Sequence, residues 1–203
     1  MLIHGFVAGS RVNGPGVRAV VYFQGCTLGC PGCWNTETHA FTGVEQTTTT
    51  VDQIAERVVS AHRVKEIEGV TFSGGEPMQQ APALHELIGT LRQELPDLSF
   101  GMYSGYSSRE LESGRYWTRS EISEKAKQYL WNALKSQLDF AVLGRYVASR
   151  RTALPLRTSP NQELRLFTDR YKICEFRPLE VEVHIQPEGL VQITGFPIAG
   201  SLL

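Results

Sequence analysis

Three cysteines within eight positions constrain this chain more than any other feature. Cys26, Cys30 and Cys33 lie on one glycine-rich loop, Gly-Cys-Thr-Leu-Gly-Cys-Pro-Gly-Cys-Trp-Asn. Thiolates at offsets of four and three residues can converge on a compact metal centre, and the glycines let the backbone turn tightly around it. The only other cysteine, Cys174, is far away in sequence, so a disulfide framework would leave one partner badly placed. The sequence therefore predicts reduced, metal-binding cysteines.

The residues alone leave two kinds of metal centre open. A four-iron cluster normally takes four cysteine ligands, and a loop that offers three leaves one iron open for a substrate or cofactor. The alternative is a structural zinc site completed by His39 or Cys174, because three cysteines and a histidine form a known closed set. Cys174 alternates with apolar neighbours, which favours a buried structural cysteine over a ligand.

The composition is that of an ordinary globular protein. The 203 residues are 41% hydrophobic and 20% charged, with a net charge of -1, which predicts one domain and gives no sign of a nucleic-acid or membrane partner. No stretch approaches the roughly 20 apolar residues of a membrane span. The N-terminus also lacks a basic region followed by an apolar run, so we expect a cytoplasmic protein.

Hydrophobic patterns predict strands that alternate with helices. Strands are expected at residues 2–12, 17–23, 69–72, 98–103 and 140–143, and helices at about 50–62, 84–95 and 118–134. Thr50 and Gln53 form a capping-box pattern at the start of the first helix, and Thr118 with Glu121 is expected to open the third. This alternation is typical of an α/β fold with a largely parallel sheet.

Three motifs follow three of these strands. The cysteine loop follows residues 17–23, Ser73-Gly74-Gly75-Glu76-Pro77 follows the next strand, and Ser104–Tyr106 ends the third. Because ligands of open α/β sheets gather at the carboxyl ends of the strands, we expect the motifs to share one rim.

The C-terminal part predicts a hairpin. Residues 179–186 and 190–196 flank Pro187-Glu188-Gly189, and Val181, Val183 and Ile185 alternate with polar residues. We therefore expect one packed apolar face and one polar face.

Two of the motifs together resemble the radical S-adenosylmethionine superfamily. The spacing Cys-x₃-Cys-x₂-Cys is similar to its cluster signature, and residues 73–77 are similar to its Gly-Gly-Glu-Pro motif. The resemblance implies an α/β fold built as a partial (β/α) barrel, to which the hairpin predicted from the sequence adds a C-terminal β-hairpin extension. It also implies a single domain over residues 1–203, with a core at about 10–165 and the extension at about 167–203.

The resemblance also implies the cofactors and their contacts. Cys26, Cys30 and Cys33 would hold a [4Fe–4S] cluster whose open iron binds S-adenosylmethionine. One electron from the reduced cluster would then release methionine and a 5′-deoxyadenosyl radical, which abstracts a hydrogen atom; no catalytic base is required. The expected cofactor contacts are Gly32, Cys33, Trp34, Asn35, Gly74, Gly75 and Glu76, with Ser104 on the same rim.

Further motifs narrow the resemblance to the activating proteins of anaerobic ribonucleotide reductases, which are glycyl-radical activases. They are residues 13–18, 30–35, 144–147 and 159–162. This resemblance implies a glycyl-radical enzyme, such as an anaerobic ribonucleotide reductase, as the partner, and a flavodoxin- or ferredoxin-type reductant.

Two departures and the C-terminal segment keep alternatives open. Leu143 stands where such activases usually carry Asp, and Pro160 stands where Ser is expected. The extension could cover the site or dock a different partner. A stand-alone radical enzyme acting on a small molecule, nucleotide or peptide is therefore the second hypothesis, and a zinc-stabilised binding module is the non-enzymatic one.

Overall fold

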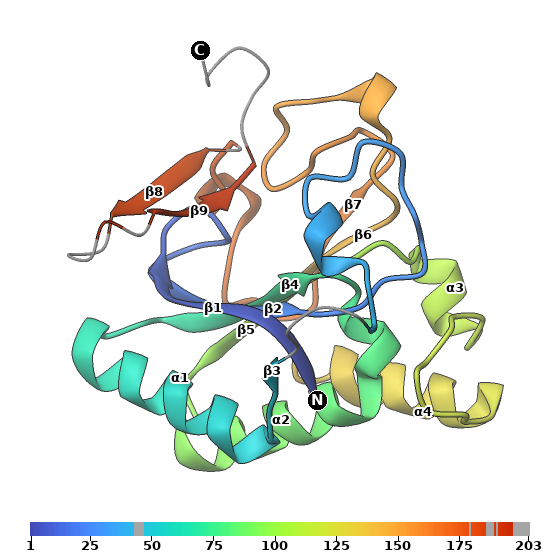
Figure 1. Ribbon diagram of the computed structural model, residues 1–203, viewed down its shortest axis with the longest axis horizontal. Helices are drawn as coiled ribbons and strands as arrows, with labels where there is room; N and C mark the ends of the chain where they lie inside the picture. Colours follow the sequence, from blue (N-terminus) through green and yellow to red (C-terminus); the bar gives the residue numbers. More distant parts are fainter. Residues whose placement is uncertain (43–46, 179, 186–188, 190, 197–203) are drawn as a thin grey trace.

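A central sheet organises the chain, with helices on one side and long connections on the other (Figure 1). The structure is a computed structural model that describes residues 1–42, 47–178, 180–185, 189 and 191–196. Its strands are β1 (Leu2–Ser10), β2 (Arg18–Phe23), β3 (Thr47–Thr48), β4 (Gly69–Gly74), β5 (Ser99–Ser104), β6 (Phe140–Leu143), β7 (Glu163–Leu166), β8 (Val181–Ile185) and β9 (Val191–Gly195). Its α-helices are α1 (Val51–Lys65), α2 (Ala81–Glu94), α3 (Ser108–Glu112) and α4 (Glu124–Lys135).

Seven strands form the sheet in the order β3-β1-β2-β4-β5-β6-β7. The four strands β2, β4, β5 and β6 are parallel, while β1 and β7 pair antiparallel at their two sides. The carboxyl ends of the parallel strands therefore lie at one rim, as the order of the motifs predicted. This arrangement confirms the α/β class and the largely parallel sheet.

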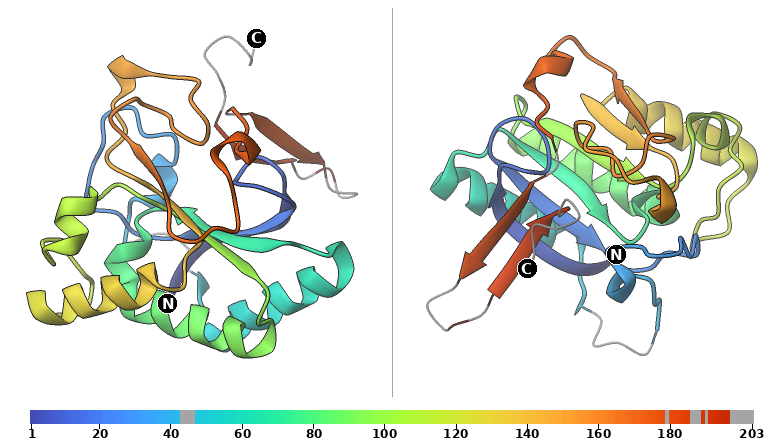
Figure 2. Two further views of the ribbon diagram at one scale, coloured as in Figure 1. Left: turned by 180° about the vertical axis from the view of Figure 1, so that it is seen from behind. Right: turned by 90° about the horizontal axis from the view of Figure 1, so that it is seen from above.

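The main core lies between the sheet and helices α1, α2 and α4, which cover one face of it (Figures 1 and 2). Phe72 of β4 sits at its centre, fully buried, with its ring 6.4 Å from that of Phe23 and 6.1 Å from that of Phe100. β2 is buried on both faces, which explains its nearly continuous apolar sequence. A smaller cluster on the other face contains Phe140, Leu156 and Phe176.

Arg18, the first residue of β2, is a buried cation that explains part of the motif at residues 13–18. Its guanidinium donates to the hydroxyl of Thr71 at 2.8 Å and to the carbonyl of Val70 at 2.9 Å, and it also reaches the Tyr171 hydroxyl. Tyr171 in turn donates to the Glu68 carboxylate, whose negative charge, with that of Asp139, favours the charged form of Arg18. The entry to β2 is therefore fixed by hydrogen bonds as well as by apolar packing.

The predicted start of the first helix is confirmed, whereas the predicted start of the third helix is not. The capping box of Thr50 and Gln53 is present at the start of α1. The third predicted helix is wrong in its start, because α4 begins at Glu124, where Ser123 caps it, and the Thr118 hydroxyl donates to the Ser120 carbonyl instead. Helix α3 and strand β7 were not predicted. Among the described residues, no helix is long and apolar enough to cross a membrane.

The predicted hairpin is present as β8 and β9, a separate two-stranded antiparallel sheet. Residues 179, 186–188 and 190 of the prediction lie outside the described residues. The expectation of a packed apolar face is wrong. Val183 and Ile193 are exposed, whereas Thr194 on the polar face is buried against the body of the protein.

Candidate cofactor site

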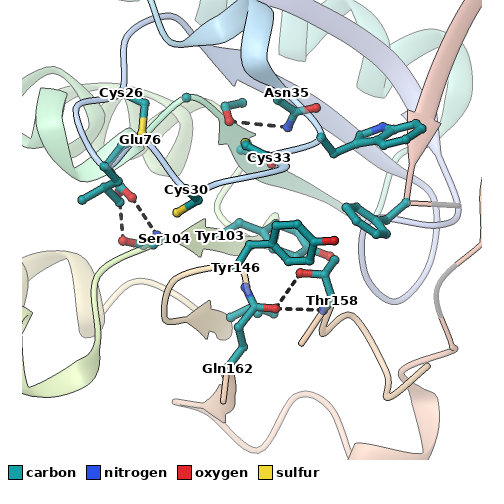
Figure 3. A pocket seen from close by; sticks show the side chains of 18 of the residues that line it. Cys26, Cys30, Cys33, Asn35, Glu76, Tyr103, Ser104, Tyr146, Thr158 and Gln162 are labelled. Carbon is teal, nitrogen blue, oxygen red and sulfur yellow. Dashed lines mark hydrogen bonds between the residues drawn. The ribbon is translucent and has the colours of Figure 1, made fainter. Parts of the chain in front are cut away.

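A cavity opens at the rim formed by the carboxyl ends of β2, β4 and β5 (Figure 3). All the predicted metal ligands and cofactor contacts except Gly32 line it: Cys26, Cys30, Cys33, Trp34, Asn35, Gly74, Gly75, Glu76 and Ser104. Gly32 is exposed on the cysteine loop, where an added Cβ would approach the Cβ of Ala148. The fold thus brings together motifs that are about 70 residues apart in the sequence.

The cysteine loop is closed at its base by its own backbone. The Gly25 amide donates to the Thr38 carbonyl at 2.7 Å, and the Cys26 amide donates to the His39 carbonyl at 3.0 Å. Gly25 has a φ of 105°, and a Cβ there would collide with the Phe41 ring, so only glycine fits this position. The three cysteines therefore project from a loop whose two ends are fixed together.

The three thiols are half-buried and face the same cavity (Figure 3). Within the part of the chain that the structure describes, no three His, Cys, Asp or Glu side chains converge on a position that one metal ion could fill. All three cysteines nevertheless line the one cavity. Cys174 is exposed on the turn Ile173–Glu175 and does not line the cavity, so the prediction that it is buried is wrong.

Burial makes the charged form of two of the three thiols unfavourable. Burial raises the pKa of Cys26 to about 11 and also raises that of Cys33, and negative charge on Cys30 adds to both shifts. At neutral pH the raised pKa therefore keeps the Cys26 and Cys33 thiols protonated unless a bound cation stabilises the thiolate form. The iron of an iron–sulfur cluster would supply that charge, so these residues fit the group that the sequence predicted.

The Gly-Gly-Glu-Pro motif packs directly against the base of the cysteine loop. The Gly75 amide donates to the Phe23 carbonyl at 2.8 Å, and the Glu76 amide donates to the Gly25 carbonyl at 2.9 Å. A Cβ on Gly75 would collide with the Gly25 carbonyl oxygen. Close approach of two backbone segments is thus one reason for this glycine, in addition to the cofactor contact expected from the sequence.

The Glu76 side chain joins the rim of β4 to the rim of β5. It is only 1% exposed, and its carboxylate accepts hydrogen bonds from the Ser104 hydroxyl at 2.9 Å and from the Gly105 amide at 2.7 Å. Burial raises its pKa to about 7 even though these donors favour the charged form. The Glu76 carboxylate also accepts a hydrogen bond from the Met78 amide and so caps the helical turn Pro77–Gln80. An acidic residue directly before a proline is the sequence signal for such a cap.

Gln79 provides a second connection that the sequence did not reveal. Its amide nitrogen donates to the Thr27 hydroxyl at 2.7 Å and to the Tyr106 hydroxyl at 2.9 Å, while its oxygen accepts from the Thr27 amide at 3.0 Å. The residue is completely buried. Gln79 therefore joins Thr27 of the cysteine loop to Tyr106, which follows β5.

The two motifs after β6 meet each other at the cavity. The Gln162 side chain accepts from the backbone amide and the hydroxyl of Thr158 at 2.8 and 2.7 Å, and donates to the Gly144 carbonyl at 3.0 Å (Figure 3). The Asn161 amide donates to the Arg145 carbonyl at 2.8 Å. Residues 144–147 and 159–162, which carry part of the family resemblance, thus form one structural unit.

Arg145 ties this unit to helix α3. Its guanidinium binds both carboxylate oxygens of Glu110, at 2.8 and 2.9 Å. Burial alone would raise the pKa of Glu110, but the hydrogen bonds from Arg145 and Ser107 outweigh it and lower the pKa to about 2. The pair therefore stays ionised over the whole physiological range.

The C-terminal extension completes the cavity wall, which was one of the two roles that the sequence left open for it. Gly195 and Phe196 line the cavity, and the Phe196 ring lies 5.5 Å from the ring of Trp34 and 5.5 Å from that of Tyr146. Thr194 fixes this end of the hairpin, because the Asn13 side chain donates to its hydroxyl at 2.8 Å. The cavity is thus built from the cysteine loop, the β6–β7 connection and the extension.

Residues 12–165 match the family described as a 4Fe-4S single cluster domain. The match includes the cysteine loop, the Gly-Gly-Glu-Pro motif and both motifs after β6, and it ends before the hairpin.

Curated relatives share this region. An anaerobic ribonucleoside-triphosphate reductase-activating protein of Vibrio cholerae is 28% identical over 160 residues, which cover 77% of this chain and 92% of the relative. A protein of the same name from Escherichia coli is 29% identical over 117 residues, or 57% of this chain and 75% of the relative. A pyruvate formate-lyase-activating enzyme of Clostridium pasteurianum is 32% identical over 94 residues, or 45% of this chain and 39% of that enzyme. They confirm the resemblance to radical S-adenosylmethionine activases and the expectation of an enzyme.

Proposed function

Because the chain belongs to the family of 4Fe-4S single cluster domains, we propose that it is a glycyl-radical-activating enzyme that cleaves S-adenosylmethionine and abstracts a hydrogen atom from a glycine of a partner enzyme. One observation carries the proposal: the three half-buried thiols of the matched loop and the Gly-Gly-Glu-Pro motif line the same cavity. We interpret the sheet as a partial (β/α) barrel and the whole chain, residues 1–203, as a single domain with a C-terminal extension from about residue 167.

Cys26, Cys30 and Cys33 would hold the [4Fe–4S] cluster as thiolates, with one iron left open. When bound, the cluster and S-adenosylmethionine supply the one-electron cleavage that yields methionine and a 5′-deoxyadenosyl radical. Cys174 leaves the fourth position free because it lies on the surface, outside the cavity lining. The protein's own contribution is to hold the loop, to limit water and to orient the cofactor.

The cofactor would lie between the cysteine loop and the ends of β4 and β5. Gly32, Cys33, Trp34 and Asn35 would contact it from the loop. Gly74, Gly75, Glu76 and Ser104 would contact it from the opposite rim, mainly through backbone groups, because the Glu76 and Ser104 side chains are already hydrogen-bonded to each other. The Asn35 amide donates to the Gly74 carbonyl at 3.5 Å, which links the two sides.

The partner that we propose follows the names of the relatives. Two of them are reductase-activating proteins and one is a lyase-activating enzyme. We therefore propose a glycyl-radical enzyme, such as an anaerobic ribonucleotide reductase, as the hydrogen donor, and a flavodoxin- or ferredoxin-type protein as the electron donor.

The test is anaerobic reconstitution with iron and sulfide, followed by reduction with dithionite in the presence of S-adenosylmethionine. We expect methionine and 5′-deoxyadenosine in equal amounts, measured by liquid chromatography. Cys30→Ala should lose the cluster and the products, because Cys30 lines the cavity. Cys174→Ala should retain both, because Cys174 is exposed and does not line it. A colourless protein with one zinc ion and no iron or sulfide would contradict the proposal.

A glycyl-radical doublet in the partner, seen by electron paramagnetic resonance after incubation with the reduced enzyme, tests the activase role itself. Deuterium transfer from a small metabolite to 5′-deoxyadenosine, with no protein radical, would instead favour a stand-alone enzyme.

A further inference from the structure

The hairpin turns an apolar face away from the body of the protein. Val183 is 53% exposed, Ile185 75%, Val191 58% and Ile193 49%. Val183 pairs with Ile193 and Ile185 pairs with Val191 across the two strands, so the four side chains lie on one face and form a continuous hairpin patch. Single exposed aliphatic residues are common on protein surfaces, but a contiguous group of them generally marks an interaction site.

The opposite, polar face of the hairpin is what holds it in place. Thr194 is only 2% exposed and is hydrogen-bonded to Asn13 and Tyr22. Both carboxylate oxygens of Glu182 accept from the Arg11 amide at 3.0 Å. Turning the patch inward would break these bonds and leave buried polar groups without partners, so the patch remains available on the surface.

The hairpin patch is continuous with the wall of the cavity. β9 runs directly into Gly195 and Phe196, which line the cavity, and its anchors Asn13 and Tyr22 line the cavity as well. The hairpin and the cysteine loop stand on the same side of the sheet, opposite helices α1, α2 and α4 (Figures 1 and 2). A protein that covers the whole length of the hairpin, from Ile185 and Val191 to Gly195, would also lie beside the cavity.

We propose that the hairpin patch is the docking surface for the glycyl-radical enzyme that this chain activates; this inference rests on the proposed function. A hydrogen donor that is part of a protein must enter the cavity with the rest of that protein spread over the surrounding surface. The patch supplies an apolar area at that place, as the centres of protein interfaces do. The hairpin lies beyond the family match at residues 12–165.

The test uses the full-length, reconstituted enzyme and an anaerobic ribonucleoside-triphosphate reductase that the wild type activates. In the double variant Ile185→Ser with Val191→Ser, we expect about tenfold or greater loss of affinity for the reductase, measured by fluorescence anisotropy. The glycyl-radical signal at limiting enzyme should fall in proportion. Cleavage of S-adenosylmethionine in the absence of the reductase should stay at the wild-type rate, because neither residue lines the cavity.

The matched control is Ile173→Ser. Ile173 is 54% exposed, similar to the patch residues. It is two residues from Tyr171, whose hydroxyl binds Glu68. Glu68 directly precedes β4, so this region lies at the amino end of the strand and the cavity lies at the carboxyl end. This variant should bind and activate the reductase as the wild type does. Equal losses in the control and the double variant, or no loss in either, would overturn the proposal.

Two other occupants of the patch would also overturn it. Self-association of the wild type in sedimentation velocity, lost in the double variant, would assign the patch to a second copy of the chain. Increased binding of an apolar dye after deletion of residues 197–203 would assign it to the chain's own C-terminus.

The docking proposal and the proposed function fail in different ways. If the wild type cleaves S-adenosylmethionine and generates the glycyl radical, but the double variant does both equally well, only the docking proposal is wrong. If the wild type generates no glycyl radical, the proposed activase role fails and the docking proposal fails with it.

Discussion

Strand β2 of the central sheet and strand β9 of the hairpin bury opposite kinds of side chain. In β2, Val20, Val21 and Phe23 are fully buried, and Val21 and Phe23 belong to the main apolar core. In β9, Thr194 is buried, while Val191 and Ile193 project into solvent. Both strands contribute a residue to the lining of the cavity, Tyr22 from β2 and Gly195 from β9, but different interactions hold them in place.

The difference follows from the surface that each strand meets. β2 meets the helices through Ala19, Val21 and Phe23 of the main core, so hydrophobic burial decides the position of that face. The hairpin meets the segment from Arg11 to Tyr22, which presents a backbone amide, an Asn amide and a Tyr hydroxyl that all need hydrogen-bond partners. Substitutions should therefore affect the two regions through different chemistry.

The largest effect is expected in the sheet. Phe72→Ala should lower the free energy of unfolding of the whole protein by about 3–5 kcal/mol, because it leaves a cavity between the rings of Phe23 and Phe100. Denaturation by guanidinium chloride, followed by circular dichroism, measures this. A loss below about 1 kcal/mol would mean that the apolar layers do not hold the sheet in the way described.

The hairpin should respond to loss of a hydroxyl instead. Thr194→Val keeps the shape of the side chain but removes the hydrogen-bond partner of Asn13 and Tyr22, which should weaken docking of the hairpin by about 1–3 kcal/mol. Hydrogen exchange of the amides in β8 and β9 should become faster, while the main unfolding transition of the sheet shifts less. Unchanged exchange would show that apolar contacts, and not the polar face, anchor the hairpin.

The ion pair of Arg145 and Glu110 tests a third kind of attachment, at the rim. The pKa of Glu110, held at about 2, lies below the roughly 4.3 of an unfolded Glu, so the pair stabilises the folded state above that value and is lost as the pH falls toward 2. Both side chains are partly exposed, so we expect only about 1 kcal/mol. The stability difference between wild type and Glu110→Gln should shrink between pH 6 and pH 3 in urea denaturation; a constant difference would contradict the assignment.

The smallest effect is expected on the hairpin patch. Ile185→Thr keeps a β-branched side chain at a position that is 75% exposed, so the free energy of unfolding should change by less than about 0.5 kcal/mol. The same measurement on Thr194→Val provides the comparison. Ile185→Thr replaces an ethyl group by a hydroxyl on the exposed face of the hairpin, and Thr194→Val replaces a hydroxyl by a methyl group on the buried face. A loss above about 1 kcal/mol for Ile185→Thr would show that the patch is packed.

Much of the sheet could be predicted because its residues obey local rules. The apolar runs of β2, β4, β5 and β6 and the capping box of Thr50 each report a requirement of the segment itself. Strand β7 has no such signal, since its four residues are at most half-buried and it forms only because β6 offers an edge. Thr118 failed as a helix start because Ser123 provides a competing cap.

The site was predicted in part for a related reason. Cysteine spacing and the glycine motif are visible in the sequence, and the strand order was enough to place them on one rim. The roles of Gln79 and Phe196 depend on which distant residues they meet, and no short pattern encodes that. The hairpin shows the same limit, because alternation of side chains identifies two faces but does not say which one the body of the protein will cover.

The closed base of the cysteine loop has a consequence for loss of the cluster in air. The bonds from Gly25 to Thr38 and from Cys26 to His39 bring the loop ends together through the backbone, so the entropy cost of closure is met by folding and not by iron. We therefore expect metal binding to be uncoupled from folding, unlike in small zinc-dependent domains that unfold without metal. Protein that has lost its cluster should keep its fold and accept a new cluster under reducing conditions.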